Sequence, residues 1–402
     1  RGLRLLIRRG PALAALRALA AELGADAVCW SRRVEPALSA RDARVAKALR
    51  EDGLEVRTFE SCLLFSPDEV RTGAGEPFRV FTPFWRACLA RPEPEPPRPV
   101  PPNLSGPASW PRSEALDSLG LLPSSDWAAG LRLAWRPGEK GARERLDAFV
   151  SAGAGGYAAA RDRPAVDGVS RLSPHLHFGE VSAREVWAAV SRRAAHETGR
   201  GPEAYLRQLG WREFAHHLLA HFPRTVSEPL RPEFAGLERL RDARSFAAWS
   251  RGRTGFPLVD AGMRELWRTG WMHNRARMIC ASFLVKDLLA DWRDGAAWFW
   301  DTLVDADQAN NTLGWQWTAG CGADAAPYFR VFNPTLQARR FDPDGAYVRR
   351  WVPELRRTPP EWIFEPLRAP RAVLAEAGAY PLPLVDHAKA RARALAAYGR
   401  LG

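Results

Sequence analysis

Short apolar runs alternate with helical patterns over the first ninety residues of the chain. The runs LRLLI, ADAVCW and LEVRTF are separated by stretches with helical spacing of apolar residues, such as ALAALRALAAEL and ARDARVAKAL. Short apolar runs are typical of buried strands, and strands that alternate with helices are typical of a parallel sheet. The pattern predicts an α/β domain with a Rossmann-like parallel sheet over residues 1–90.

A proline-rich stretch, RPEPEPPRPVPPNLSGP, follows this region from Arg91 to Pro107. Its prolines exclude a helix and favour an extended spacer. Beyond it the pattern becomes almost entirely helical, as in PEAYLRQLGWREFAHHLLAHF, and no repeat of fixed period is present. We therefore expect a linker over residues 91–112 and an all-α domain over residues 113–402.

Charge and cysteine content narrow the range of partners and compartments. The formal net charge is +12, which favours a polyanion such as nucleic acid. A generally basic surface is the alternative, because only four of the 58 basic residues are lysine. The five cysteines form no C-x-x-C pair, which argues against disulfides and thiolate metal sites and favours a reducing cytoplasm. The first ten residues are too charged for a signal peptide or a membrane span.

The segment DADQANNTLGWQW, residues 305–317, carries the densest candidate chemistry. Its acids and asparagines usually indicate a solvated surface loop, and the alternative is a hydrogen-bonding wall for a cofactor. Trp315 and Trp317 lie beside Gly314 in a stretch of low helical propensity, a setting in which aromatic side chains face a ligand or a nucleobase. By contrast, Trp267 and Trp271 are spaced for packing one above the other in a core.

Two further motifs offer polar side chains at helical spacing. In GWMHNRARM, Asn274 and Met278 share one helix face, and His273 and Arg277 share the next. In HHLLAH, His217 and His221 have the spacing of zinc ligands, but neither an H-E-x-x-H order nor a third ligand is present. We therefore predict no metal site and expect these histidines on an exposed or DNA-facing side of a helix. Phosphate-binding loops of the G-x-x-x-x-G-K-[ST] and G-x-G-x-x-G types are also absent from the sequence.

An ordered set of motifs resembles the flavin domain of the photolyase and cryptochrome family. The set comprises SRLSPHLHFGEVS, QLGWREF, GWMHNRARM, DLLADWRDG and DADQANNTLGWQW followed by DAAPYFRVFNP. The resemblance runs from about Ser113 to the C-terminus and is closest to class I cyclobutane pyrimidine dimer photolyases. It implies an N-terminal α/β antenna domain, a long linker and an all-α domain that binds FAD in a U-shaped conformation.

The resemblance implies which residues contact FAD. Asp305, Ala306 and Asp307 match the segment beside the isoalloxazine and ribose, and Arg277 is implied to pair with Asp305 and balance a reduced, anionic flavin. Asn311 matches the residue that faces flavin N5, where DNA-repair members carry an amide and photoreceptors usually carry an acid or a cysteine. The positions that grip the phosphates and ribose or complete the pocket are matched by Tyr157, Val169, Ser170, Arg171, Leu172, Ser173 and Tyr205.

The substrate side is implied in the same way. Trp211 and Trp317 match the two indoles that hold a flipped-out pyrimidine dimer, and Gln208 stands where well-known dimer-repairing members have glutamate. Photolyases are among the enzymes known to extrude their target base, so this mechanism comes from the family. The other pocket and DNA-contacting positions are matched by Asn274, Arg275, Met278, Arg161, Arg330 and Gln337.

Electron supply and light harvesting show departures from the family pattern. Trp315 and then Trp292 match the inner steps of the electron relay, but the outer position falls near Arg239, which leaves Trp249 as another exit. Ala37 and Leu38 replace the asparagine and glutamate of folate-binding members, so a folate antenna is disfavoured and a deazaflavin or no antenna stays open. No arginine-rich first strand precedes Arg1, and we expect the antenna domain to lack roughly its first third.

The resemblance predicts a carbon-carbon lyase that repairs cyclobutane pyrimidine dimers, with photoexcited reduced FAD as the electron donor. The expected partner is UV-damaged DNA, and the expected state is a monomer in a bacterial cytoplasm, associated with the nucleoid and with no membrane. The alternatives are a (6-4) photoproduct photolyase, a blue-light cryptochrome and an inactive flavin-binding remnant. A (6-4) photoproduct photolyase would carry a histidine pair where this chain has Met272 and His273. A signalling cryptochrome would need a long C-terminal tail, for which DHAKARARALAAYGRLG leaves little room.

Overall fold

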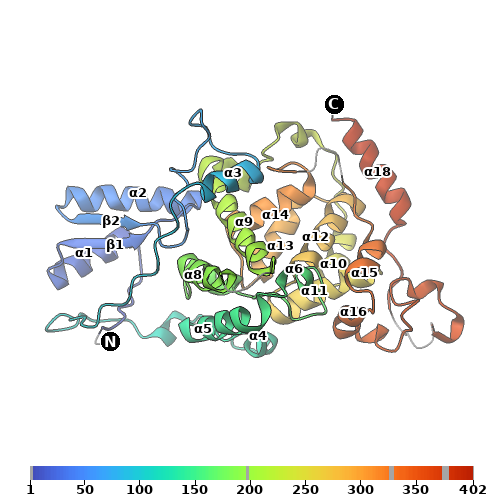
Figure 1. Cartoon of the computed structure of the whole chain (residues 1–402), viewed down its shortest axis with the longest axis horizontal. Coiled ribbons are helices and arrows are strands. Elements are labelled where there is room, and N and C mark those ends of the chain that lie inside the picture. The colour runs from blue at the N-terminus through green and yellow to red at the C-terminus, as the bar shows by residue number, and fades with distance from the viewer. Residues whose placement is uncertain (1–2, 196–198, 326–329, 374–379, 402) are drawn as a thin grey trace.

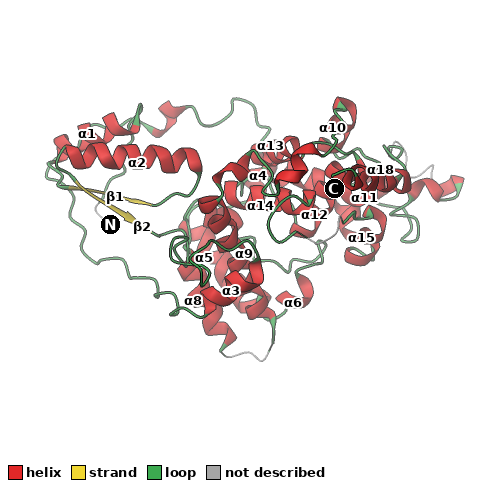
Figure 2. Ribbon diagram, turned by 90° about the horizontal axis from the view of Figure 1, so that it is seen from above, coloured by secondary structure: helices red, strands yellow, loops and turns green. Residues whose placement is uncertain are grey.

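The N-terminal part of the protein is a small parallel sheet covered by two helices. The computed structural model describes residues 3–195, 199–325, 330–373 and 380–401. Strand β1 (Ala27–Ser31) pairs in parallel with β2 (Glu55–Phe59), so that Val28 lies opposite Val56. Helices α1 (Ala12–Leu23) and α2 (Pro36–Glu51) lie on the same side of this sheet (Figure 2). The predicted parallel α/β pattern is confirmed.

The sheet and its helices are joined by a small apolar core. Val45 and Leu49 of α2 pack with Val56 of β2, and Leu49 is completely buried. Val56 is the buried residue of β2, whereas its neighbours along the strand are exposed, as expected for a strand with one covered face. Gly24 ends α1 in the left-handed conformation, with φ of 59°, and turns the chain toward β1.

A long extended segment connects this part to the rest of the molecule. After β2 the chain forms helix α3 (Phe81–Leu89) and then runs without helix or strand through the proline-rich stretch, as Figure 1 shows. Phe81, Phe84 and Trp85 of α3 are buried and belong to the same apolar cluster as Phe214. The division into residues 1–90, 91–112 and 113–402 stays a prediction, because this cluster spans its first boundary.

The C-terminal part is built of helices, as predicted. Its α-helices are α4 (Ala129–Ala134), α5 (Glu139–Ala148), α6 (Tyr157–Ala160), α7 (Ser173–His177), α8 (Ala183–Ala194), α9 (Gly201–His221), α10 (Ala243–Ser250), α11 (Pro257–Thr269), α12 (Asn274–Ser282), α13 (Trp292–Thr302), α14 (Gln308–Ala319), α15 (Pro334–Phe341), α16 (Ala346–Trp351) and α18 (His387–Gly399). Short 3₁₀ segments are η1 (Leu116–Leu119), η3 (Pro223–Val226), η4 (Pro232–Gly236), η6 (Pro353–Leu355) and η7 (Pro366–Arg368), and π-helical turns are η2 (Phe149–Gly153) and η5 (Phe283–Asp287).

Two apolar cores lie on either side of helix α14. One is formed mainly by α10 to α13 with α15, α16 and α18, and the other by α3, α5, α8 and α9. Helix α14 contacts both α9 and α13, so it stands between the two groups of helices. Residues at its N-terminus, centre and C-terminus are therefore fixed by packing from both sides.

The surface-loop alternative for residues 305–317 is wrong, because most of these residues form α14. The Asp307 carboxylate caps the helix by accepting a hydrogen bond of 2.8 Å from the Asn310 backbone N–H. Trp315 and Gln316 are buried, and tertiary burial outweighs the weak intrinsic helical propensity of the segment. Gly314 lies on an exposed face of the helix.

The histidines of HHLLAH attach the N-terminal part to α9, and the prediction of an exposed or DNA-facing position is wrong for His217. His217 Nε2 accepts a hydrogen bond of 3.0 Å from the Phe78 backbone N–H, and the ring is 1% exposed. Burial lowers its pKa to about 3. The neighbouring Glu213 carboxylate accepts hydrogen bonds from the backbone N–H groups of Leu64 and Phe65. These bonds tie the segment between β2 and α3 to α9.

The described part of the chain shows neither a candidate metal site nor a membrane-spanning helix. Among the residues that the structure describes, no group of three or more His, Cys, Asp or Glu side chains is placed to hold a metal ion. Within the same described ranges, no helix has the length and apolar character needed to cross a bilayer.

Candidate functional site

A buried ion pair lies at the centre of the helical part. Arg277 of α12 donates hydrogen bonds of 2.8 and 3.0 Å to the two carboxylate oxygens of Asp305. Asp305 lies in the turn that precedes α14. The Arg277 Nε–H also donates to the Met272 carbonyl at 2.7 Å. The side chain of Asp305 is 3% exposed and that of Arg277 is 24% exposed, so the guanidinium keeps one side accessible. The predicted pairing of Arg277 with Asp305 is present.

Cationic and hydroxyl side chains surround an indole next to this pair. The Arg171 guanidinium lies over the Trp271 ring at 4.7 Å, and that of Arg277 lies 5.9 Å from it. The Trp271 Nε1–H donates to the Ser173 hydroxyl at 3.4 Å. Arg171 has a φ of 52°, a left-handed conformation that costs a non-glycine residue roughly 1–3 kcal/mol. Its Nε is buried and has no hydrogen-bond partner among the described residues. An acceptor atom of a ligand would satisfy this N–H group.

A cluster of two tyrosines and a serine continues this wall. Tyr205 of α9 donates its hydroxyl hydrogen to Ser170 at 3.0 Å, and its ring lies 5.2 Å from that of Tyr157, edge to face. Burial raises the pKa of both phenols, so they stay neutral donors. Leu172 is 1% exposed and Val169 packs at the edge of the same core. The structure thus brings together the run from Val169 to Ser173 with Tyr157 and Tyr205.

The N-terminal half of α14 carries further polar groups. Asn311 donates from Nδ2 to the Ala296 carbonyl at 3.0 Å, which fixes the plane of its amide. Asp307 lies one turn earlier, close to His177 and His216. Ala306 lies between the two acids and packs at the edge of the larger core.

The indole of Trp315 is buried against α13. It is 2% exposed, and its six-membered ring lies where a Cβ at Gly295 would approach to 2.1 Å. Any side chain at position 295 would therefore displace this ring. Trp292, which begins α13, is 4% exposed and has the Arg293 guanidinium 5.1 Å above its ring.

A series of aromatic rings leads from Trp315 to the surface. Trp249 lies 6.3 Å from Trp315, and Phe246 lies 5.6 Å from Trp249 and 6.4 Å from Trp298. Trp298 stacks on Trp267 at 6.1 Å. The expected core packing of Trp267 on Trp271 is wrong, because Trp267 is 65% exposed and pairs with Trp298.

Side chains from three elements form a second polar group. Gln208 of α9 accepts a hydrogen bond of 3.2 Å from Arg161, and Arg275 of α12 contacts Asp162 at 2.6 Å. Met278 follows Arg275 by one turn, and its sulfur lies 3.8 Å from the nearest nitrogens of Arg275 and Asn274. The structure therefore brings together five residues matched to substrate or DNA contacts: Arg161, Gln208, Asn274, Arg275 and Met278.

A hollow extends from the same face of α12 toward the C-terminal end of α14. Ser282 continues the Asn274 and Met278 face of the helix by a further turn. The hollow is lined by Ser282, Lys286, Trp317, Thr318, Gly320, Arg330 and Phe332. Arg330 is exposed at its side, and Gln337 is half-buried on α15.

Trp211 has an unexpected neighbour. Its ring stacks on Phe81 of α3 at 3.8 Å with an interplanar angle of 7°, so one of its faces is already covered. Arg207 lies over the Phe81 ring at 4.7 Å. The sequence offers no signal for this contact, because the two residues lie in parts of the chain that are separated by the proline-rich stretch.

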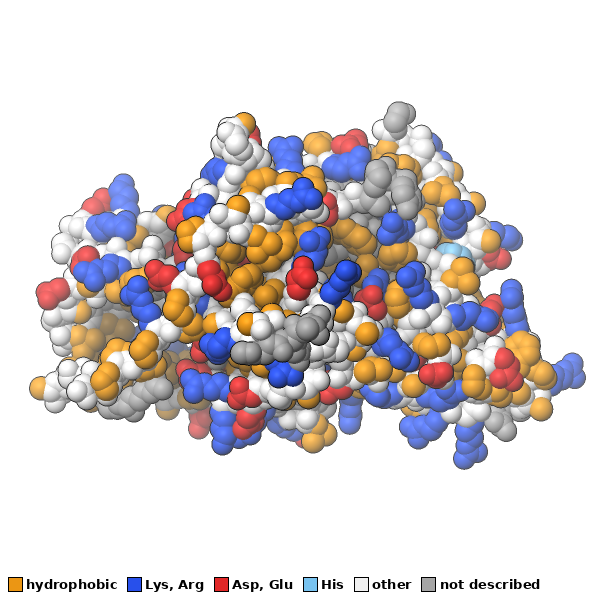
Figure 3. Space-filling model, viewed as in Figure 1, with side chains coloured by type: hydrophobic (Ala, Val, Ile, Leu, Met, Phe, Trp, Pro, Cys, Tyr) orange, Lys and Arg blue, Asp and Glu red, His pale blue; other side chains and the backbone are white. Residues whose placement is uncertain are grey.

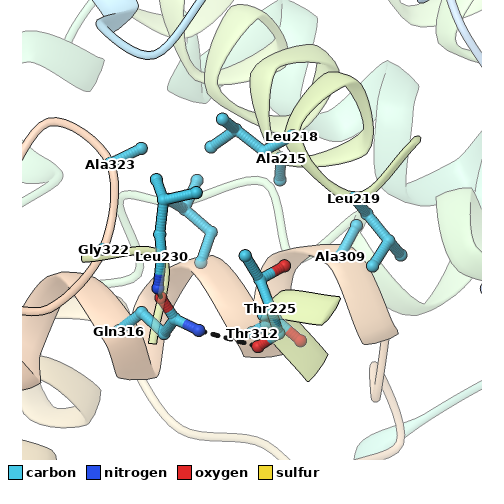
Figure 4. A pocket seen from close by; sticks show the side chains of 11 residues that line it. Ala215, Leu218, Leu219, Thr225, Leu230, Ala309, Thr312, Gln316, Gly322 and Ala323 are labelled. Atoms are coloured by element: carbon cyan, nitrogen blue, oxygen red, sulfur yellow. Dashed lines mark hydrogen bonds between the residues drawn. The ribbon is translucent and has the colours of Figure 1, made fainter. Parts of the chain in front are cut away.

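A small apolar cavity lies between α14 and part of α9, which contact each other elsewhere (Figure 4). Gln316 stands at its edge and donates from Nε2 to the carbonyls of Thr225 and Glu228, both at 2.7 Å. Its Oε1 accepts from the Leu230 backbone N–H at 2.9 Å. These bonds hold the C-terminal half of α14 in a fixed position.

The comparisons with known proteins identify the family. A family model described as the FAD binding domain of DNA photolyase matches residues 205–400, and one described as DNA photolyase matches residues 1–102. A deoxyribodipyrimidine photo-lyase from Agrobacterium fabrum is 49% identical over 99% of this chain and 84% of its own length. The chain belongs to the photolyase and cryptochrome family.

Other members of the photolyase and cryptochrome family are also similar. A crystal structure of a bacterial class III photolyase from Agrobacterium tumefaciens superposes with a TM-score of 0.96 at 48% identity and covers 99% of this chain and 84% of that one. Its class differs from the class I subgroup that the sequence motifs predicted. Cryptochrome-1 of Arabidopsis thaliana is 39% identical over 96% of this chain and 59% of its own length.

The family match establishes FAD as the cofactor against which the site is judged. The side chains suit an anionic dinucleotide, because they combine the Arg171 and Arg277 guanidiniums with the hydroxyls of Ser170, Ser173 and Tyr157. The partnerless Arg171 Nε supports the same conclusion. Sequence reasoning missed His177, His216, Asp162 and Trp271 in this photolyase-type site. A signal existed for three of them, since His177, His216 and Trp271 lie inside or beside the family motifs.

Proposed function

We propose that the protein uses light to repair cyclobutane pyrimidine dimers in DNA. The observation that carries the proposal is the composition of α14, which bears Asn311, Trp315 and Trp317 directly after the two acids Asp305 and Asp307. Its relatives named deoxyribodipyrimidine photo-lyase span nearly the whole chain. The resemblance to the family implies that an amide at position 311 is typical of repair members.

The flavin side of the mechanism is proposed to rest on charge balance and orientation. Bound, reduced FAD supplies an electron to the dimer when it is photoexcited. Arg277 offers the accessible side of its guanidinium to the extra negative charge of the reduced form, while Asp305 keeps the arginine in place. Asn311, whose amide is held by Ala296, presents a neutral hydrogen-bonding group toward flavin N5. The remaining flavin contacts are proposed for Tyr157, Val169, Ser170, Arg171, Leu172, Ser173, Tyr205, Ala306 and Asp307.

The lesion side is proposed to take the extruded dimer between indoles and polar groups. Trp317 and the uncovered face of Trp211 replace the stacking that the dimer loses. Gln208 can donate and accept hydrogen bonds at the pyrimidine edge, but it cannot transfer a proton. Asn274, Arg275 and Met278 line the pocket, and Arg161, Arg330 and Gln337 contact the flanking DNA.

Electron supply is proposed to pass through Trp315. Trp292 and Trp249 are its two candidate donors, and the aromatic contacts beyond Trp249 support a branch that ends at the exposed Trp267. We also propose that the protein acts as a monomer on nucleoid DNA in the cytoplasm, which size-exclusion chromatography with light scattering can test.

Among the described residues, one face of the molecule carries no continuous basic stripe that would mark a path for DNA. In Figure 3 apolar side chains spread over the middle of the visible face, and Lys and Arg side chains are scattered around them without forming one stripe. Specific phosphate contacts are therefore assigned to individual arginines near the hollow and not to the net charge as a whole.

The decisive experiment measures repair directly. Purified, photoreduced protein is mixed with thymine oligonucleotides that contain cyclobutane dimers, and the pyrimidine absorbance is followed under blue light and in the dark. We expect recovery of absorbance in the light only, and no change with (6-4) photoproducts. Bound flavin without repair of either lesion would overturn the proposal and favour the cryptochrome or inactive alternatives.

Replacement of Trp317 tests the lesion side separately. We expect Trp317→Ala to weaken binding of dimer-containing DNA by about 1–3 kcal/mol, the range for one lost base-stacking contact, with an unchanged flavin spectrum. Trp300→Ala is the matched control, since Trp300 is a half-exposed indole on α13. Fluorescence anisotropy with damaged and undamaged duplexes gives both affinities. Equal losses for the two duplexes would show that Trp317 does not read the lesion.

A further inference from the structure

The carboxylate of Asp307 lies between two histidines from different helices. Its Oδ2 is 3.4 Å from His216 Nε2 on α9 and 3.6 Å from His177 Nδ1 on α7. Its Oδ1 accepts hydrogen bonds from Asn310, at 2.8 Å from the backbone N–H and at 2.7 Å from Nδ2. One oxygen therefore caps α14, and the other faces two imidazole nitrogens.

Hydrogen bonding at the far side of His216 restricts its protonation. His216 Nδ1 lies 2.9 Å from the Arg212 carbonyl oxygen, which can only accept, so Nδ1 carries a hydrogen. If Nε2 were bare, its lone pair would point at the Asp307 carboxylate. A proton between the two groups, either on His216 or on Asp307, removes this repulsion.

The position of that proton follows from the surroundings of Asp307. Burial disfavours the carboxylate, but His216 and His177 outweigh burial and hold the pKa of Asp307 well below its ordinary value. Asp307 is thus ionised, so a proton placed between the two groups belongs to the imidazole. His177 can donate from Nδ1 as a neutral imidazole, so it needs no second proton.

Other charged groups face the pair from every neighbouring element. Arg212 flanks His216 on α9, and Arg33 and Glu35 approach Asp307 from the loop after β1. Arg33 and Glu35 neutralise one another at 3.0 Å, as Arg277 and Asp305 do. Glu213 also lies near His216, and burial raises its pKa. Histidine is the side chain that ordinarily changes its charge close to neutral pH.

We propose that His216 sets the charge of the flavin pocket through Asp307, so that reduced, anionic FAD is held more tightly while His216 is protonated. The inference rests on the proposed contact between Asp307 and the flavin. A protonated His216 leaves Asp307 compensated, and a neutral His216 leaves an uncompensated carboxylate beside a cofactor that gains negative charge on reduction. His216 thereby acts on the flavin through Asp307, as a positioning residue, and does not itself touch the substrate.

The test is an equilibrium redox titration of the flavin in the full-length holoprotein. Anaerobic mixtures with a reference dye give the ratio of reduced to oxidised flavin from about pH 5.5 to about pH 8.5, where histidine ordinarily titrates. Variants are compared with wild type at each pH, because flavin reduction itself takes up protons. His216→Gln removes the charge, and His216→Arg makes it permanent.

We expect His216→Gln to lower the ratio of reduced to oxidised flavin by roughly tenfold at the acidic end, the effect of one unit charge about 12 Å away at an effective dielectric constant of about 20. The difference from wild type should vanish at the alkaline end, where an imidazole ordinarily has lost its charge. His216→Arg should match wild type in acid and exceed it by a similar factor in base.

Two outcomes would overturn the inference. One is a His216→Gln protein with the wild-type ratio in acid, and the other is a His216→Arg protein that follows the wild-type curve over the whole range. If neither variant folds, ¹⁵N-histidine spectra of the wild-type protein decide, because a neutral His216 at about pH 6 contradicts the proposal. None of these readouts needs DNA, so a failure here is distinct from a failure of dimer repair.

Discussion

Replacing Trp315 by phenylalanine should slow photoreduction of bound FAD by more than about tenfold, which corresponds to an increase of about 1.4 kcal/mol in the activation free energy. Trp315 is buried one helical turn beyond Asn311, and phenylalanine is much harder to oxidise than tryptophan. The aromatic shape of the site is largely kept, so the flavin should stay bound. Flash photolysis of the oxidised holoprotein measures the rate, and absorbance measures the flavin content.

The same experiment separates the two proposed branches behind Trp315. Trp292→Phe and Trp249→Phe should each reduce the yield in part, and the double variant should approach Trp315→Phe. Trp300→Phe is the matched control, because Trp300 lies on α13 but is half-exposed and outside the series of ring contacts described above. Wild-type photoreduction in Trp315→Phe would contradict the relay as a whole. Dimer repair by chemically reduced enzyme should be little affected in the Trp292 and Trp249 variants.

Replacing Arg277 by leucine should cost about 3–5 kcal/mol in the free energy of unfolding, because a buried carboxylate loses its partner. The side chain of Asp305 is 3% exposed and cannot regain hydration without a local opening of the turn before α14. We expect the variant to lose FAD during purification. Urea unfolding gives the stability, and the ratio of flavin to protein absorbance gives the occupancy.

Two companion variants make this prediction specific. Arg277→Leu with Asp305→Asn removes both charges and should recover much of the stability but not the affinity for flavin. Arg293→Leu is the matched control, since its pair with Asp291 is partly exposed and such pairs contribute only about 0–1 kcal/mol. If the Arg277→Leu protein were as stable as the Arg293→Leu protein, the ion pair of Arg277 with Asp305 would contribute no more to stability than a partly exposed pair.

The general architecture could be read from the sequence because it depends on local patterns. Alternating apolar runs predicted the parallel sheet, and the change to helical spacing after Pro107 predicted the helical part. The pairing of Arg277 with Asp305 came from the family resemblance, since two residues that lie 28 positions apart give no local signal.

Other features could not be read because they depend on tertiary packing. Helix α14 forms in spite of Gly314 because it is buried between two cores and capped by Asp307. His217 looked like a surface residue, but its partner is the backbone of Phe78, 139 residues earlier. The stacking of Trp211 on Phe81 likewise joins segments that only the folded chain brings together.

Position 295 gives the site an evolutionary constraint that no ligand contact would reveal. Because the Trp315 ring fills the space that a Cβ would need, even alanine there must move the indole or the helix that carries it. A saturation library at this codon, selected for survival of ultraviolet irradiation followed by blue light, should return glycine alone. Selection for light-driven repair would thus be recorded at a residue with no side chain.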